Sequence, residues 1–231
     1  MAFVLPEGLA PEVYPLAWLV GRWHGQGVVG YPGIDETAFV QDVVFDHDGG
    51  PYLSYTSTIR LVVAPDDASA LADAAPDEAA PDHAALDHAA LDRAAPDRAA
   101  PDEGGAGDGA PSARPTSDVP VEDGPVWSTE SGYWRVPPER PADLPDAQFP
   151  VEVLLADPSG HVAVYVGAVG NGRVDLASDL IARTATGADV TAAKRLYGLV
   201  NGELMWAHDM AAFGRPMQSY ASARLARVED A

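Results

Sequence analysis

The sequence predicts an all-β fold in which about ten short antiparallel strands close into one up-and-down barrel, interrupted by a single acidic insertion. Short runs of alternating apolar and polar residues are separated by turn residues, as at 46–50 and at Asn201-Gly202. No run suits a long helix. Pairing of the last strand with the first would leave no sheet edge exposed, so closure is the economical arrangement.

Each element follows from the order of these runs along the chain. Residues 1–16 carry three prolines and are expected to form an extended N-terminal lead-in against the barrel. The barrel itself is predicted from residues 17–63 and 124–229. Residues 180–193 are expected to be a polar connection with at most one helical turn. The predicted strands are 17–29, 36–46, 52–63, 127–136, 151–156, 161–169, 173–178, 194–200, 203–210 and 216–228.

The insertion, residues 64–123, is a low-complexity segment rich in Ala, Pro and Asp. Between Ala74 and Glu103 it repeats a five-residue unit, as in Ala-Ala-Pro-Asp-Glu, and only two of these units carry a leucine. A β-helix of pentapeptides needs a bulky apolar residue in every unit, and proline removes a ladder donor. We therefore expect a disordered loop. His83 and His88 within it have no ligand geometry that favours a metal site.

Composition restricts the partners and the chemistry. The 231 residues include 35 acidic and 14 basic residues, for a net charge of −21, and residues 66–123 hold 15 of the acids with 3 bases. This charge argues against nucleic acid and anionic membranes as partners. The absence of Cys excludes disulfides and thiolate chemistry. The first residues have neither a basic nor an apolar signal region, so a cytoplasmic protein is expected.

One glycine-rich stretch marks the first strand. Gly21, Trp23, Gly25 and Gly27 alternate through it and are followed by Tyr31-Pro32. Glycine inside a strand indicates a bulge, a corner, or the close approach of another backbone or a ligand. The stretch therefore predicts a strand that curls sharply while one indole ring stays on its inner face.

This Gly-x-Trp-x-Gly-x-Gly stretch followed by Tyr-Pro resembles the first strand of the nitrobindin family, small haem-binding β-barrels of calycin or lipocalin-like shape that are also similar to fatty-acid-binding proteins. The similarity extends over residues 127–135, 151–169 and 173–228. The resemblance implies a b-type haem in the barrel, ferric-haem conversion of peroxynitrite to nitrate, and nitric oxide as a further ligand.

Two positions depart from the family's pattern. The family holds haem iron through one His near the start of the last strand, and the matching stretch here is Pro216-Met217-Gln218-Ser219-Tyr220. Tyr220 therefore stands where the ligand His is expected, which puts haem binding and isomerase activity in question. In the turn after the first strand, Gly33 replaces the threonine that the family typically has.

A phenol with a pKa near 10 must lose its proton to bind iron, whereas a neutral imidazole binds directly. Tyr220 is thus expected to pack in the barrel wall. One alternative is that it ligates ferric haem as a phenolate, as in catalase, with Arg215 or Arg224 as the neighbouring cation. Another is a substitute ligand, for which His208 is a candidate because it shares a strand face with Trp206 and Met210.

Other basic residues are weaker candidates for the cavity. Lys194 and Arg195 begin a strand and could pair with haem propionates at the cavity mouth, although bases there are usually solvated. A surface or partly bonded position is favoured for His208. His24 is expected to point outward beside Trp23, and solvated turn positions are expected for His47 and His161.

No stand-alone catalytic motif occurs in the sequence, so any function is assigned to the barrel cavity. Three hypotheses follow. The first is a nitrobindin-like barrel without the family's haem-ligating His. The second is a ferric haem protein that uses Tyr220 or another ligand, and the third is a non-catalytic module that binds a small apolar molecule. Oligomeric state is left open, with a homodimer as one alternative.

Overall fold

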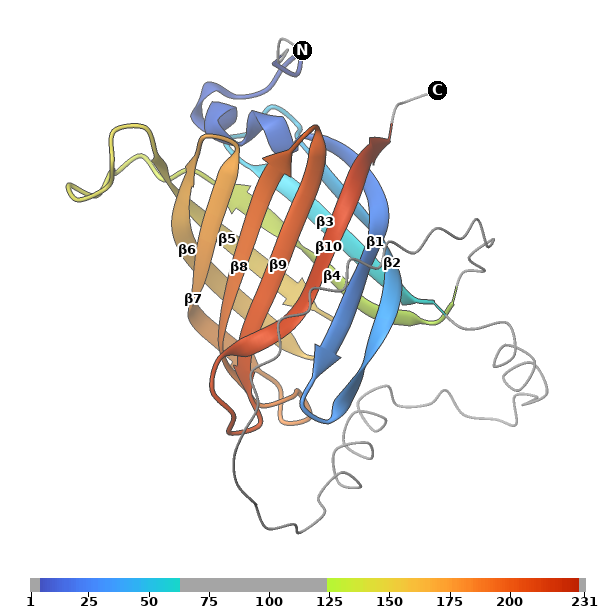
Figure 1. Cartoon of the computed structure of the whole chain (residues 1–231). Helices are drawn as coiled ribbons and strands as arrows, with labels where there is room; N and C mark the ends of the chain where they lie inside the picture. The colour runs from blue at the N-terminus through green and yellow to red at the C-terminus, as the bar shows by residue number, and fades with distance from the viewer. Residues whose placement is uncertain (1–4, 63–123, 229–231) are drawn as a thin grey trace, which may run out of the picture.

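The computed structural model describes residues 5–62 and 124–228, which form ten antiparallel strands wrapped into one closed barrel (Figure 1). Strand order around the barrel follows chain order, and β10 pairs with β1 to close it. The predicted up-and-down barrel is confirmed. The strands are β1 Gly21–Tyr31, β2 Ile34–Asp46, β3 Leu53–Leu61, β4 Val126–Arg135, β5 Phe149–Asp157, β6 His161–Gly170, β7 Arg173–Arg183, β8 Val190–Val200, β9 Glu203–Ala212 and β10 Gln218–Val228.

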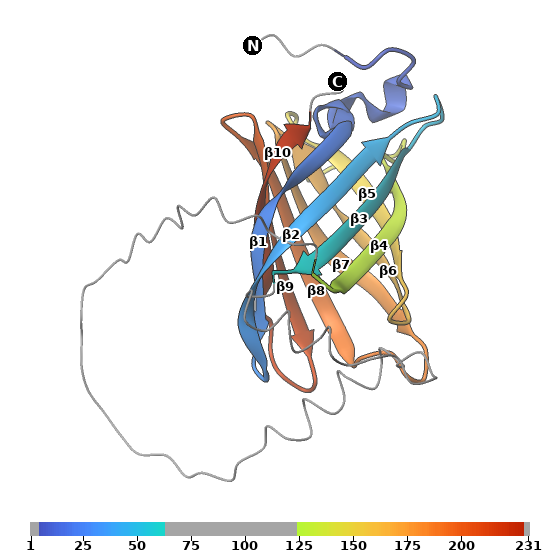
Figure 2. The same ribbon diagram turned by 90° about the vertical axis from the view of Figure 1, so that its right-hand side faces the viewer.

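The glycines of β1 allow β10 to lie close enough to close the barrel (Figure 2). A Cβ atom at Gly25 would overlap the carbonyl oxygen of Arg224, and one at Gly27 would overlap that of Ser222. Both oxygens belong to β10. Of the alternatives that glycine inside a strand indicates, the close approach of a second backbone is therefore the one found at these two positions.

Trp23 fixes the start of β1. Its ring is buried, and its Nε1–H donates to the carbonyl oxygen of Leu19 at 2.8 Å. The guanidinium of Arg227, on β10, lies 4.1 Å from the centre of the same ring and donates to the carbonyl oxygens of Trp18 and Val20. The first and last strands are thus joined by side chains as well as by backbone pairing.

A 3₁₀ helix, η1 Pro11–Leu19, covers one end of the barrel (Figure 1). This corrects the expected extended conformation up to residue 16 and the expected strand start at residue 17. Val13, Leu16 and Leu19 are fully buried, at a spacing of three residues. Because a 3₁₀ helix has three residues per turn, this spacing places the three side chains on one face. The prolines disfavour an α-helix, but they are compatible with this short 3₁₀ helix, which contains Pro15.

The barrel interior is packed with aromatic rings near η1. Phe45 and Trp134 are buried and meet edge to face, with ring centres 5.2 Å apart. Trp134 in turn meets Tyr197 at 5.1 Å. These rings belong to one buried hydrophobic cluster, which continues to the other end of the barrel through residues such as Tyr31 and Met210.

Residues 180–193 do not form the expected polar connection. β7 continues to Arg183 and β8 begins at Val190, so both strands are longer than predicted. In the last part of β7, consecutive residues are exposed, as at Asp179-Leu180 and Ala182-Arg183. Sequence alternation fails there because of a bulge: Tyr165 pairs with Ser178 and Val164 with Leu180, so Asp179 is an extra residue that shifts the alternation.

The insertion predicted to be disordered lies outside the described residues. The two strands on either side of it, β3 and β4, are direct antiparallel neighbours. The backbone N–H of Leu61 donates to the carbonyl oxygen of Pro125 at 3.0 Å, so the ladder reaches the ends of both strands.

Deletion of Asp67 to Asp118 is expected to leave the urea unfolding midpoint unchanged, because the pairing of β3 with β4 is complete without those residues. Equilibrium unfolding followed by tryptophan fluorescence measures the midpoint. Loss of soluble expression after the deletion would contradict this expectation.

Gly25→Ala is expected to lower the free energy of unfolding by about 1–3 kcal/mol, because the added Cβ overlaps the β10 backbone. Gly198→Ala is the matched control, since it is also a strand glycine but its Cβ would have no neighbour within 4 Å. Chemical denaturation of both variants measures the difference. Equal stabilities for the two variants would be inconsistent with the proposed role of Gly25.

Candidate functional site

The half of the barrel away from η1 contains a chamber of about 380 Å³, a volume within the range of small-molecule sites. It lies beside the turns that join β1 to β2, β5 to β6 and β7 to β8. Most of its lining is apolar. The apolar residues include Leu155, Ala163, Ile181, Val190, Ala193, Met210 and Phe213.

A smaller void of about 50 Å³ lies between this chamber and the core. Its wall includes a buried hydrogen-bonded chain in which Trp206 Nε1–H donates to Gln41 Oε1 at 2.7 Å and Gln41 Nε2–H donates to Ser57 Oγ at 2.8 Å. The chamber and the void share one set of residues, here called the shared wall. The shared wall consists of Trp127, Ser128, Glu130, Arg195, His208 and Tyr220.

Tyr220 stands at a bulge of β10. Ser219 pairs with Asp209 and Ala221 pairs with His208, so Tyr220 is the extra residue between two ladder pairs. Its hydroxyl oxygen accepts a hydrogen bond from Trp127 Nε1–H at 2.9 Å. Its ring meets the His208 ring edge to face, with centres 5.4 Å apart. The bulge therefore directs Tyr220 into the shared wall.

His208 lies in the shared wall with intermediate exposure, so the surface position that the sequence favoured as one possibility is wrong. Burial, and then the positive charge of Arg195, lowers the pKa of His208 well below its ordinary value of 6.5, so the ring is neutral at pH 7. Its Nε2 atom is buried and has no hydrogen-bond partner among the described residues. As predicted, His208 lies on the same face of β9 as Trp206 and Met210.

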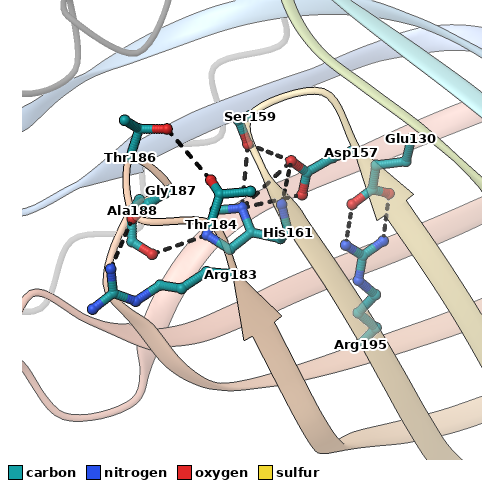
Figure 3. A network of polar contacts seen from close by, with 10 residues as sticks. All are labelled: Glu130, Asp157, Ser159, His161, Arg183, Thr184, Thr186, Gly187, Ala188 and Arg195. Atoms are coloured by element: carbon teal, nitrogen blue, oxygen red, sulfur yellow. Dashed lines mark hydrogen bonds and ion pairs between the residues drawn. The ribbon is translucent and has the colours of Figure 1, made fainter.

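Arg195 and Glu130 form a buried ion pair in the shared wall (Figure 3). Arg195 Nη1–H donates to Glu130 Oε2 at 2.7 Å, and Nη2–H donates to Oε1. Burial alone would lower the pKa of Arg195, but Glu130, with Tyr165 and Tyr197, raises it well above its ordinary value. The guanidinium is therefore charged and its charge is balanced within the wall.

Lys194 is exposed on the outer face of β8, because neighbouring residues of a strand point to opposite faces. This corrects the expectation that it faces the cavity mouth. Arg195 is the inward-facing member of the pair. The sequence did not single out Glu130, whose only signal was an acidic residue on a strand that also carries Trp127 and Trp134.

Gly33 lines the chamber in the turn between β1 and β2, where its φ of 100° favours glycine. A side chain at this position would be strained in the same backbone conformation.

His161 joins two turns at the rim of the chamber, which corrects its expected solvated position (Figure 3). Its Nε2–H donates to the carbonyl oxygen of Ala188 at 2.9 Å. Its Nδ1 lies 3.3 Å from both Ser159 Oγ and Asp157 Oδ2. The turn after β5 and the loop before β8 are therefore held together. His24 is exposed, as predicted, and contacts Asp42 at 2.8 Å.

Within residues 5–62 and 124–228, no three His, Cys, Asp or Glu side chains are grouped to hold a metal ion. Haem iron needs only one protein ligand, and the shared wall offers a phenol and a neutral imidazole beside an apolar chamber. The residues present thus fit a haem or another mainly apolar molecule more closely than a free metal ion.

Comparison with known proteins places this geometry in context. The family model for the THAP4-like, haem-binding β-barrel domain matches residues 12–227. The chain is 47% identical to a ferric nitrobindin-like protein of Beutenbergia cavernae over 99% of this chain and 100% of the relative. It is 37% identical to a peroxynitrite isomerase of Frankia casuarinae, with coverages of 96% and 88%. The crystal structure of Rv2717c from M. tuberculosis superposes with a TM-score of 0.60 at 26% identity, covering 96% of this chain and 99% of that one.

The neutral state of His208 predicts a loss of stability in acid. Because its folded pKa lies below the unfolded value of 6.5, the unfolded chain binds a proton that the folded chain does not. The contribution of His208 to the free energy of unfolding is fully present well above pH 6.5. As the pH falls below 6.5, this contribution decreases by at most about 1.4 kcal/mol per pH unit.

Urea unfolding of the wild type and His208→Met, between pH 8.5 and 5.5, tests this prediction. The wild type is expected to lose more stability than the variant below pH 6.5, while the two should run parallel from pH 7.5 to 8.5. Equal losses below pH 6.5 would show that His208 is not the responsible group.

Proposed function

Because the chain belongs to the nitrobindin family of haem-binding β-barrels, we propose that it binds haem or another mainly apolar molecule in its chamber without the family's imidazole bond to iron. It then does not isomerise peroxynitrite as the relatives named for that activity do. The observation that carries this proposal is Tyr220, which stands in the shared wall, accepts a hydrogen bond from Trp127, and occupies the position at which the sequence resemblance implies the ligand His.

The chemistry of the phenol supports the loss of the iron bond. Tyrosine must lose a proton to ligate iron, and a ferrous ion scarcely favours that loss. Arg224, one of the cations considered for holding a phenolate, instead pairs with Glu203 on the exposed side of the sheet, at 2.7 Å from its Nε. Arg215 is also exposed. Neither residue is placed to stabilise a phenolate inside the barrel.

The apolar wall supports the binding of a mainly apolar molecule. Ile181, Val190, Met210 and Phe213 would contact it, and the rim held by His161 would restrict its access to water. Haem, when bound in such a chamber, supplies an iron centre that reacts with small oxygen- and nitrogen-containing molecules. Without an imidazole at position 220, this chain is expected to hold b-type haem by apolar contact.

An absorption titration with ferric haem tests the proposal on the wild type, Tyr220→His and Tyr220→Phe. Tyr220→His is expected to bind haem at least about tenfold more tightly than the wild type, a difference of about 1.4 kcal/mol, with the Soret band of an imidazole complex. The wild type and Tyr220→Phe are expected to give matching weak spectra.

Two results would overturn the proposal. A phenolate charge-transfer band in the wild type that disappears in Tyr220→Phe would make Tyr220 an iron ligand. Failure of Tyr220→His to gain affinity would mean that position 220 is not the ligand position in this chain.

A second candidate is a ferric haem protein with another iron ligand, and His208 favours it. Its ring is neutral, its Nε2 has no partner in the described part of the chain, and it lines the chamber beside Tyr220. His208→Met distinguishes this candidate in the same titration. A saturable Soret band that survives in Tyr220→Phe and disappears in His208→Met would assign iron ligation to His208.

Location and assembly remain predictions of the sequence. Across the described residues, no helix is long and apolar enough to cross a membrane. A cytoplasmic location is expected from the N-terminal residues, and the absence of nucleic-acid partners is expected from the net charge of −21, with the oligomeric state open and a homodimer as one alternative.

A further inference from the structure

The Arg195–Glu130 pair lies where a ligand in the chamber would meet the shared wall. Both residues line the chamber and the smaller void. The side chains are 6% and 18% exposed, so neither charge is solvated as it would be on the outer surface. Charged groups in such a position control which ligand charges the chamber accepts.

The guanidinium is organised as a carboxylate site. Its two Nη atoms meet both oxygens of Glu130, the Tyr197 hydroxyl lies 3.5 Å from Nη1, and the Tyr165 ring lies 5.2 Å from Cζ. A planar fork of this kind recognises carboxylates in two-point contact. In this protein, the carboxylate of Glu130 already occupies the two Nη atoms of Arg195.

The pair therefore presents no net charge to a ligand. A ligand carboxylate brought to the same place would stand against the Glu130 carboxylate in a poorly solvated interior, where like charges repel strongly. It would also lose its hydration without gaining a free cation. An uncharged group meets neither penalty.

Two polar atoms of the shared wall indicate what an uncharged ligand could offer. Arg195 Nε and His208 Nε2 are buried without a hydrogen-bond partner in the described part of the chain. An unpaired buried polar atom destabilises the protein. A ligand hydroxyl could pair with either atom, because it both donates and accepts, and a carbonyl oxygen could accept from a nitrogen that carries a hydrogen, as Arg195 Nε does. The rest of the chamber favours an apolar body.

We propose that the deep end of the chamber takes an uncharged, mainly apolar molecule with a hydroxyl or carbonyl oxygen at its leading end, and that Glu130 sets this specificity by occupying Arg195. This inference rests on the proposed function, that the chamber binds a ligand. A molecule with carboxylates along one edge fits only when its uncharged edge enters first.

Competition binding tests the proposal. The neutral fluorophore N-phenyl-1-naphthylamine reports occupancy of the chamber, and 1-decanol or decanoate displaces it. The measured quantity is the ratio of the two inhibition constants, decanoate over decanol. In the wild type this ratio is expected to be large, and Glu130→Gln is expected to lower it by at least about tenfold, because the freed guanidinium then attracts the carboxylate.

Glu152→Gln is the matched control. Glu152 pairs with Arg135 at 2.6 Å, but this pair lies on the outer face of the barrel with 32% and 54% of the side chains exposed. The variant removes the same charge from the protein and is expected to keep the wild-type ratio. A Glu130→Gln ratio equal to that of Glu152→Gln would overturn the proposal.

Removal of one partner of a buried pair is often destabilising, so a second variant is needed. The double variant Glu130→Gln with Arg195→Gln removes both charges, and its ratio is expected to remain within about threefold of the wild type because no free cation is created. A double variant that binds decanoate as tightly as decanol would contradict the role of the pair. If no form of the protein binds the fluorophore or haem, the proposed function itself fails, which is a separate result.

Discussion

The close contact between β1 and β10 is the constraint on which the remaining structure depends. Because Gly25 and Gly27 have no Cβ, the β10 backbone can lie against β1 and complete the ladder. Trp23 and Arg227 then join the same two strands through a ring and a guanidinium. A barrel closed in this way has no edge to protect, and its interior is shaped by what covers each end.

The two ends of the barrel differ in how they are filled. η1 places three aliphatic side chains over one end, and the aromatic rings below it are packed around Trp134. At the other end the strands extend beyond the core, and turns joined by His161 surround the chamber. The helix η1 and the Trp134 rings thus lie at one end of the barrel and the chamber at the other, and chamber residues such as Leu155 and Met210 also belong to the buried hydrophobic cluster.

Electrostatic coupling within the shared wall links the site residues. Glu130 balances the positive charge of Arg195. Burial is the main cause of the low pKa of His208, and the charge of Arg195 is the second cause. The neutral imidazole and the phenol of Tyr220 then meet edge to face. The wall thus combines polar groups with no net charge and an apolar chamber, which is consistent with a binding role for an uncharged surface of the ligand.

Sequence alone determined the barrel, its closure and the importance of the β1 glycines, because strand alternation and glycine spacing are local properties of the chain. It also identified Tyr220 through a resemblance that depends on consecutive residues. Only the tertiary structure decided that η1 is helical, that Lys194 points outward, and that Glu130, Arg195 and His208 share one wall. These residues come from β4, β8 and β9, and no local pattern records which strand faces meet across the interior.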